Sequence, residues 1–456
     1  MPKEKDNYWF KSGLINVVQN SSSVLFSIGG FLFLIRILSK EDFGAWVLFN
    51  SSVTILNIIR DGLLKSAVIK FLSTASEEDK PKIIKSSFIV DGFLTLFIIV
   101  VNFMFAHVLA NYWNLPQIIN LFYLYNIVYI FSGFITQFNC IEQANLRYKG
   151  IFVSNTINSG IFFSFIFVSF IIKIDIQLYQ LVIVQIISNL ISAFTAYLYV
   201  KNYLIMAKGY FKEWVVKLLN FGKYAFGTSV SSILSTTIDQ WMLGNMISPA
   251  ASGAFNIAVR IVNLSDIPTN AIAIIVFPKS AKRNESEGKE GVKYLYEKSV
   301  GTIFAILVPF VIVVFIFSDL VVFLIAGEKY EDTVPLLRVT LITCLLIPFG
   351  RQFGSILDSI GKTKTNFYVV LFTASFNLIL NFFLISRIGI MGAAYATLIS
   401  NIVGFIVAQY ILKKELGVNV LNTFIYAYYF YPEFYFKFLR PKLVQYKLLE
   451  ESFKKI

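Results

Sequence analysis

Long apolar runs alternate with short polar or charged segments along the whole chain, as in LFSIGGFLFLI, LTLFIIVVNFMFAHVLA and TIFAILVPFVIVVFIF. A helix needs about 20 mostly apolar residues to cross a bilayer, so these runs predict membrane spans and not core strands. The predicted spans lie near residues 13–36, 43–60, 86–109, 118–140, 151–172, 177–200, 222–245, 251–277, 300–325, 333–357, 365–386 and 390–412. The predicted fold class is an all-α polytopic membrane protein with about 12 transmembrane helices.

Composition and the placement of charge support this interpretation. The 456 residues are 56% hydrophobic and 15% charged, with a formal net charge of +13. If the N-terminus is cytosolic, 33 of the 40 Lys and Arg residues fall in the inner segments and Arg260 falls inside a span. The outer segments hold only Arg36, Lys40, Lys173, Lys329, Arg338 and Arg387. Cytosolic loops of membrane proteins carry such an excess, so both termini are predicted to be cytosolic and no nucleic-acid partner is expected.

The loops offer little for catalysis. The outer loops are short and carry no paired carboxylates beyond the run GEKYED, and the inner loops have no phosphate-binding glycine loop followed by Lys-Ser or Lys-Thr. The single histidine and two distant cysteines match no metal-ligand spacing. We expect no enzyme activity, no metal site and no cofactor.

Two turns share one pattern and indicate an internal repeat. LSKEDFGAW, after the first predicted span, matches ISPAASGAF, after the seventh, in its aliphatic residue, serine, Gly-Ala pair and aromatic residue. Transporters are often built from such repeats, with the substrate path between them. The sequence predicts a six-helix bundle over 1–200, a cytosolic linker over 201–221, a second six-helix bundle over 222–413, and an aromatic and basic tail over 414–456 at the cytosolic membrane surface.

The order of several stretches resembles that of the polysaccharide (O-antigen) flippases of the multidrug/oligosaccharidyl-lipid/polysaccharide exporter superfamily. These stretches are RILSKEDFGAW, LRYKGIFVSN, IDQWMLGNMISPAASGAFNIAVRI, FPKSAKR, IAGEKYEDTVPLLRV and GKTKTNFYVVLFTASFNLILNFFLISRIGIMGAAYATLIS. The resemblance implies two bundles related by a pseudo-twofold axis around a central cavity. It also implies a flippase in the bacterial cytoplasmic (inner) membrane, which moves undecaprenyl-diphosphate-linked oligosaccharides to the outer leaflet by alternating access during O-antigen or capsule synthesis. Membrane lipids and a polysaccharide polymerase are the other partners it implies.

Charged residues inside two predicted spans are candidates for substrate and ion binding. Asp239 and Arg260 are predicted at similar depth, where an unmatched charge costs about 2.5 to 3.5 kcal/mol. A guanidinium offers a fork of donors to phosphate oxygens, and FNIAVRI resembles the setting of an arginine implicated in substrate recognition in lipid II flippases. Arg260 is therefore a candidate for binding the diphosphate or an acidic sugar, the alternative being a structural pair with Asp239. Asp239 and, further along, Asp266 are candidates for Na+ or H+ coupling.

Polar residues also mark spans of the first bundle. Asn16, Gln19 and Asn20 share a helix face and are candidates for a sugar-binding lumen, although interhelical hydrogen bonds explain such a face equally well. Arg60, Asp61 and Asp91 fall near the inner ends of predicted spans, and we expect them at the membrane interface.

Two other function classes remain as alternatives. A cation-coupled multidrug antiporter of the same superfamily usually carries an aspartate in its first span, whereas residues 13–36 contain no carboxylate. A membrane polysaccharide polymerase or glycosyltransferase would need a catalytic outer loop, which the sequence lacks.

Overall fold

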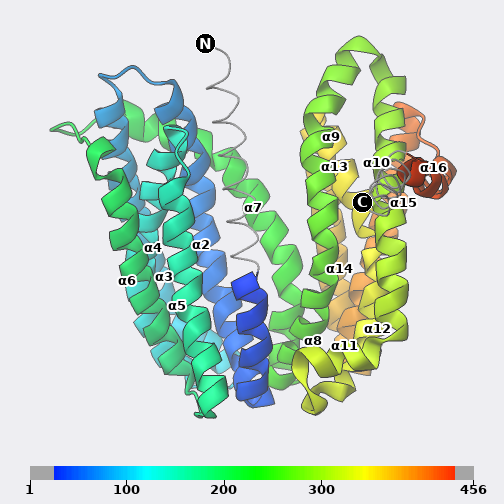
Figure 1. Cartoon of the computed structure of the whole chain (residues 1–456), viewed down its shortest axis with the longest axis horizontal. Coiled ribbons are helices and arrows are strands. Elements are labelled where there is room, and N and C mark those ends of the chain that lie inside the picture. Colours follow the sequence, from blue (N-terminus) through cyan, green and yellow to red (C-terminus); the bar gives the residue numbers. More distant parts are fainter. Residues whose placement is uncertain (1–24, 437–456) are drawn as a thin grey trace, which may run out of the picture. The chain divides into compact units, whose positions relative to one another are not determined.

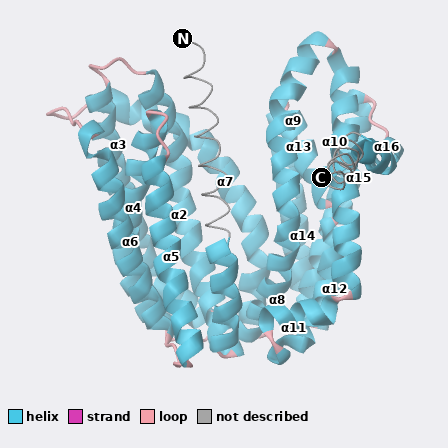
Figure 2. Cartoon of the chain, in the orientation of Figure 1, coloured by secondary structure: helices cyan, strands magenta, loops and turns pink. Residues whose placement is uncertain are grey.

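The structure of the chain is a computed structural model that describes residues 25–436, without the side chains of residues 222–236 and 274. The described part is helical and contains no strand (Figure 2). A first helix covers Leu25–Ile37. The helices that follow (Figure 1) are α2 Lys40–Thr74, α3 Lys80–Tyr112, α4 Ile118–Ala144, α5 Lys149–Ile172, α6 Leu178–Val200, α7 Lys212–Met246, α8 Pro249–Val262, α9 Asp266–Ser286, α10 Gly288–Ile316, α11 Ser318–Ala326, α12 Val334–Cys344, α13 Ile347–Ser359, α14 Thr363–Ile388, α15 Ile390–Leu416 and α16 Val420–Phe434. Short 3-10 turns over Lys201–Tyr203, Asn263–Ser265 and Glu328–Thr333 join neighbouring helices.

The prediction of a multi-pass membrane protein is confirmed. Within the described residues, 10 helical segments are long and apolar enough to cross a membrane. The segment over α8 and α9 is one of them, and so is the segment from Glu328 to Ser359. Helix α7 is not among them, which fits its polar sequence GTSVSSILSTTIDQ. The predicted count of twelve spans stays a prediction, because residues 13–24 of the first predicted span lie outside the described residues.

The chain divides into two compact units, residues 1–254 and 255–456. In the first unit α2 is the central helix, since it packs against α3, α4 and α7, while α4, α5 and α6 pack on one another. In the second unit α9 packs against α10 and α13, α14 packs against α15, and α16 packs along α10. The predicted bundle boundaries at 200, 222 and 413 remain predictions.

The two repeat turns each begin a helix in the same way. Ser39 is the N-cap of α2, and its hydroxyl accepts a hydrogen bond from the Asp42 backbone N–H at 3.0 Å. Before α8, the Ser248 hydroxyl accepts one from the Ala251 backbone N–H at 3.2 Å. A serine at this place satisfies one of the backbone donors that a helix start leaves unpaired, which explains why both copies of the turn keep it.

The Gly-Ala pairs of the two turns meet within the first unit. A Cβ added to Gly253 would lie 3.2 Å from the Cα of Gly44. A Cβ added to Gly44 would collide with the carbonyl oxygen of Pro249 at the start of α8. Because backbone atoms cannot be displaced as a flexible side chain can, the first turns of α2 and α8 approach this closely only when both residues are glycine.

The C-terminal part of α7 is held to α2 and to the end of α3. The Trp241 indole N–H donates to the Ser51 hydroxyl at 2.9 Å, and the Trp113 indole N–H donates to the Trp241 carbonyl at 3.1 Å. The amide of Asn245 donates to the Tyr112 carbonyl. Indole groups combine a large apolar contact with one directed hydrogen bond, so they fix α7 in register against α2.

In the second unit, α16 docks side-on to α10. The buried carboxylate of Glu297 accepts hydrogen bonds from the Asn419 backbone N–H at 2.8 Å and the Asn422 amide at 2.9 Å. One turn along, Gly301 lets the backbone of Thr423 come close to α10. At its 15 residues α16 is too short to span a bilayer. That the tail lies on the cytosolic membrane surface stays a prediction.

We expect Gly44→Ala to destabilise the protein by about 1–3 kcal/mol or more, because the added methyl group meets backbone that cannot move aside. The measurement is the thermal unfolding midpoint of the purified protein in detergent. Gly160→Ala is the matched control, since its Cβ would meet only an edge carbon of Phe26 at 3.8 Å. Equal midpoints for the two variants would contradict the close approach.

Candidate functional site

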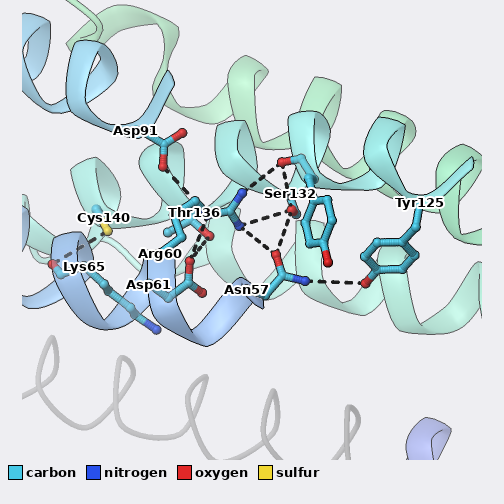
Figure 3. A network of polar contacts seen from close by, with 10 residues as sticks. Asn57, Arg60, Asp61, Lys65, Asp91, Tyr125, Ser132, Thr136 and Cys140 are labelled. Atoms are coloured by element: carbon cyan, nitrogen blue, oxygen red, sulfur yellow. Dashed lines mark hydrogen bonds and ion pairs between the residues drawn. The ribbon is translucent and has the colours of Figure 1, made fainter. Parts of the chain in front are cut away.

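A buried arginine organises the polar contacts of the first unit. The side chain of Arg60, on α2, is 1% exposed. Its Nη1 donates to the Tyr129 carbonyl on α4 at 2.9 Å, and its Nη2 donates to Asn57 Oδ1 at 3.2 Å and to Ser132 Oγ at 3.1 Å (Figure 3). A guanidinium has five N–H donors in a rigid plane, and this one joins a helix backbone to side chains of α2 and α4.

Two carboxylates lie beside Arg60. Its Nε is 3.4 Å from Asp61 Oδ1 and 3.9 Å from Asp91 Oδ1. Asp61 is 38% exposed and also accepts a hydrogen bond from Thr136, whereas the Asp91 side chain, on α3, is 9% exposed. The three charged groups therefore sum to one negative charge when all are ionised, and the more deeply buried carboxylate is the one with fewer contacts.

Several buried polar atoms around Asp91 have no hydrogen-bond partner among the described residues. They are Asp91 Oδ1, Thr95 Oγ1 and both amide atoms of Gln137. A Cβ on Gly133 would lie 2.7 Å from Asp91 Oδ2, 3.2 Å from Arg60 Nη1 and 3.3 Å from Thr95 Oγ1. Buried polar groups are nearly always hydrogen-bonded, so a cluster of unsatisfied ones marks a place where something else binds or where the groups rearrange.

Arg60 and Asp91 are not solvated side chains at a helix end, and their position at the membrane interface stays a prediction. Both are buried between helices, because α2 continues to Thr74 past the predicted end of its span and α4 covers Arg60. The sequence did hold a signal for this site. Asn57, Arg60 and Asp61 are spaced by three and four residues, which places them on one helix face.

In the second unit, the candidate charged residues lie on either side of a helix interruption. The predicted span 251–277 is helical, but α8 ends at Val262 and α9 begins at Asp266, with a 3-10 turn between them. Arg260 lies in the last turn of α8, is exposed, and donates from Nε to Asn256 Oδ1 at 3.3 Å. A cation in the last turn of a helix and a carboxylate in the first turn of the next both suit the helix dipole.

Asp266 is held in an ion pair that the sequence did not reveal. Its Oδ1 lies 3.1 Å from Arg351 Nη2 on α13, and the two side chains are 30% and 46% exposed. The partners are 85 positions apart, so no local spacing could have joined them. The role of Asp266 in ion coupling stays a prediction.

The remaining predicted site residues are only partly placed. Asp239 is buried on α7 in the first unit, next to the buried Gln240. Arg260 belongs to the second unit, and the pairing of Arg260 with Asp239 stays a prediction. The predicted lumen residues Asn16, Gln19 and Asn20 lie outside the described residues. The described residues bring no three His, Cys, Asp or Glu side chains together as a metal site.

Comparison with known proteins identifies the family of the chain. The sequence profile of the polysaccharide biosynthesis protein family matches residues 33–335, a range that includes Arg60, Asp91 and Arg260. The chain belongs to this family. The resemblance to polysaccharide flippases is confirmed by the relatives that the sequence matches. A Shigella flexneri protein described as a candidate O-antigen transporter is 23% identical over 90% of this chain and 98% of its own length.

The chain shares its fold with two solved membrane transporters. The lipid II flippase MurJ in an inward closed conformation superposes with a TM-score of 0.75, at 15% identity, over 91% of this chain and 90% of MurJ. An inward-facing multidrug transporter of the MATE family superposes with a TM-score of 0.71, at 16% identity, over 86% of this chain and 96% of that chain. At these identities the likeness concerns the fold and not the cargo.

Gly133→Ala should lower the free energy of unfolding of the protein by about 1–3 kcal/mol, because the methyl group would overlap with the Arg60 and Asp91 side chains. Gly92→Ala, next to Asp91 on the same α3 helix, is the matched control, since nothing lies within 4 Å of its Cβ. The unfolding midpoint in detergent measures both variants. A Gly133→Ala protein as stable as the control would mean that the cluster has more room than the structure gives it.

Proposed function

We propose that the chain moves undecaprenyl-diphosphate-linked oligosaccharides from the inner to the outer leaflet of the bacterial cytoplasmic membrane. The family match over residues 33–335 is the observation that carries this proposal, because that family makes polysaccharides and this chain is built of membrane-crossing helices. The Shigella relative, described as a candidate O-antigen transporter, supports a saccharide cargo, and the MurJ likeness supports a transporter fold. The protein acts by transport and not by catalysis.

We assign binding of the diphosphate to Arg260. Arg260 is an exposed residue in a mostly apolar segment, and the hydrogen bond from Nε to Asn256 Oδ1 orients the plane of its guanidinium. Arginine binds phosphate oxygens through two parallel N–H bonds, which a neutral lumen could not provide. A break in a membrane helix exposes backbone polar groups, and such breaks are tolerated where they line a water-filled path. The turn between α8 and α9 therefore belongs to the substrate path in this proposal.

The finer architecture follows the predicted topology. We place twelve spans in two six-helix bundles around a central cavity, with both termini in the cytosol, on the strength of the Lys and Arg distribution. Asn16, Gln19 and Asn20 would face the sugar, and Asp239 would lie near the diphosphate end. Flipping then alternates between states open to either side, and a polysaccharide polymerase consumes the product on the outer leaflet.

A cation-coupled multidrug antiporter is the second candidate, because the MATE transporter shares the fold at a TM-score of 0.71. It would need a hydrophobic cargo site and a carboxylate for coupling. The residues of the first predicted span include no carboxylate, which favours the flippase.

Arg260→Ala should reduce lipid-linked oligosaccharide flipping by at least about tenfold, since losing charge-assisted hydrogen bonds to a phosphate costs roughly 1.5–3 kcal/mol. The assay follows a fluorescent undecaprenyl-diphosphate oligosaccharide to the opposite leaflet of proteoliposomes. Arg260→Lys should retain part of the activity, because lysine keeps the charge and loses the planar fork.

Arg283→Ala is the matched control, because Arg283 lies at the far end of α9 in an exposed pair with Glu287 at 3.5 Å. Full activity of Arg260→Ala would assign that residue a structural role. Wild-type protein that moves a cationic drug and not the oligosaccharide would establish the antiporter instead.

A further inference from the structure

The donors of Arg60 are used by groups other than Asp91. Nη1 and Nη2 are bound to the Tyr129 carbonyl, to Asn57 and to Ser132, and Nε is closer to Asp61 than to Asp91. At 3.9 Å, Asp91 Oδ1 is within range of an ion pair but beyond a hydrogen bond, and it has no hydrogen-bond partner. A buried ionised carboxylate without hydrogen bonds is strongly disfavoured, so this geometry suits a carboxyl group that has taken up a proton.

The surroundings of Asp91 offer what a protonated carboxyl needs. A carboxylic acid must donate one hydrogen bond, and Gln137, on α4, and Thr95, one turn along α3, hold buried oxygen atoms that are without a partner. Asp91 Oδ2 and Thr95 Oγ1 lie close to Gly133, where an added Cβ would come within 2.7 Å and 3.3 Å of them. The ionised form would need donors directed at both of its oxygens, and Asp91 Oδ1 has none among the described residues.

The groups that face Asp91 from the neighbouring helices set its charge balance. Helix α2 contributes Arg60 and Asp61, and α4 contributes Gln137 and Cys140. Lys65, also on α2, is exposed and acts on Cys140. The described α7 residues packed nearby, Leu218, Val215 and Phe221, are apolar. With Arg60 positive and both aspartates negative, one bound proton brings the cluster to neutrality.

We infer that Asp91 is a proton-binding site gated by Arg60, which alternates between the carboxylates of Asp61 and Asp91. When a proton from the aqueous phase adds to the Asp91 carboxylate, Arg60 stays with Asp61 and the α4 carbonyl, as in this structure. When Asp91 releases the proton, its new charge draws the guanidinium away from Tyr129 and Ser132. The contact between α2 and α4 then loosens. Resting on the proposed function, this exchange couples proton movement to the flipping cycle.

A metal cation is a poorer occupant than a proton. Arg60 Nε lies 3.9 Å from Asp91 Oδ1, so a Na+ ion bound to that oxygen would lie near a second positive charge in a buried site, where like charges repel strongly. A purely structural ion pair is also a poorer explanation, because such a pair would be hydrogen-bonded when buried. The exposed side of Asp61 gives water a route to the cluster, whereas Asp91 itself is nearly sealed.

The test is infrared difference spectroscopy of the full-length protein in proteoliposomes, recorded between acidic and alkaline pH without substrate. We expect the C=O stretch of a protonated carboxyl group that disappears as the pH rises, and we expect Asp91→Asn to abolish it. Asp42→Asn, in the first turn of α2, makes the same substitution at a carboxylate bound to Ser39 and should leave the band intact. Asp91→Glu keeps a carboxyl group at the site and should retain a titrating band even if Asp91→Asn folds poorly.

The absence of any band that depends on residue 91, in folded protein, would overturn the inference. A band that responds to Na+ at constant pH would replace the proton with a metal ion. In the transport assay, a pH gradient should accelerate flipping by the wild type, and Asp91→Asn should lose that dependence while Asp42→Asn keeps it. If the band is present and oligosaccharide is not moved, the proton site stands and the proposed cargo fails.

Discussion

The guanidinium of Arg60 carries a full positive charge into a bundle of apolar helices, and the packing of α2, α3 and α4 is built around it. Lipid offers no hydrogen bonds, so the protein itself must provide a partner for every donor. The Tyr129 carbonyl, Asn57 and Ser132 meet this demand and fix how far α2 can slide or rotate against α4. Helix positions in the first unit are thus set by a few directed contacts as well as by shape.

Much of the helical architecture can be predicted from hydropathy because lipid-facing helices are apolar on most sides. The predicted span at 86–109 lies within α3, and the span at 365–386 lies within α14. The serines of the two repeat turns cap their helices because that chemistry is local. Hydropathy fails where a charge is hidden by another helix. The predicted span ended at Arg60 because a charged residue was expected to be in contact with water. In the structure, the Tyr129 carbonyl and the Ser132 hydroxyl of α4 take the place of water around Arg60.

Other features of the candidate site are beyond sequence reasoning for the same physical reason. The helix break at Asn263–Ser265 is the exception, because Pro268 has no N–H to bond the Leu264 carbonyl and its ring crowds that carbonyl. The pair between Asp266 and Arg351 depends on how α9 and α13 lie together. Arg260 could be identified as a candidate from the sequence, because it is a single cation in an apolar run. A network of unsatisfied atoms around Asp91 becomes visible only when three helices are assembled.

The meeting of Gly44 with the first turn of α8 bears on the history of the chain. The repeat suggests that one ancestral turn was copied, and in the present protein the two copies have become each other's neighbours. After such a duplication, each copy can usually change independently of the other. Here a side chain added at either Gly44 or Gly253 would push the two helix starts apart, so neither position can be changed without affecting the other.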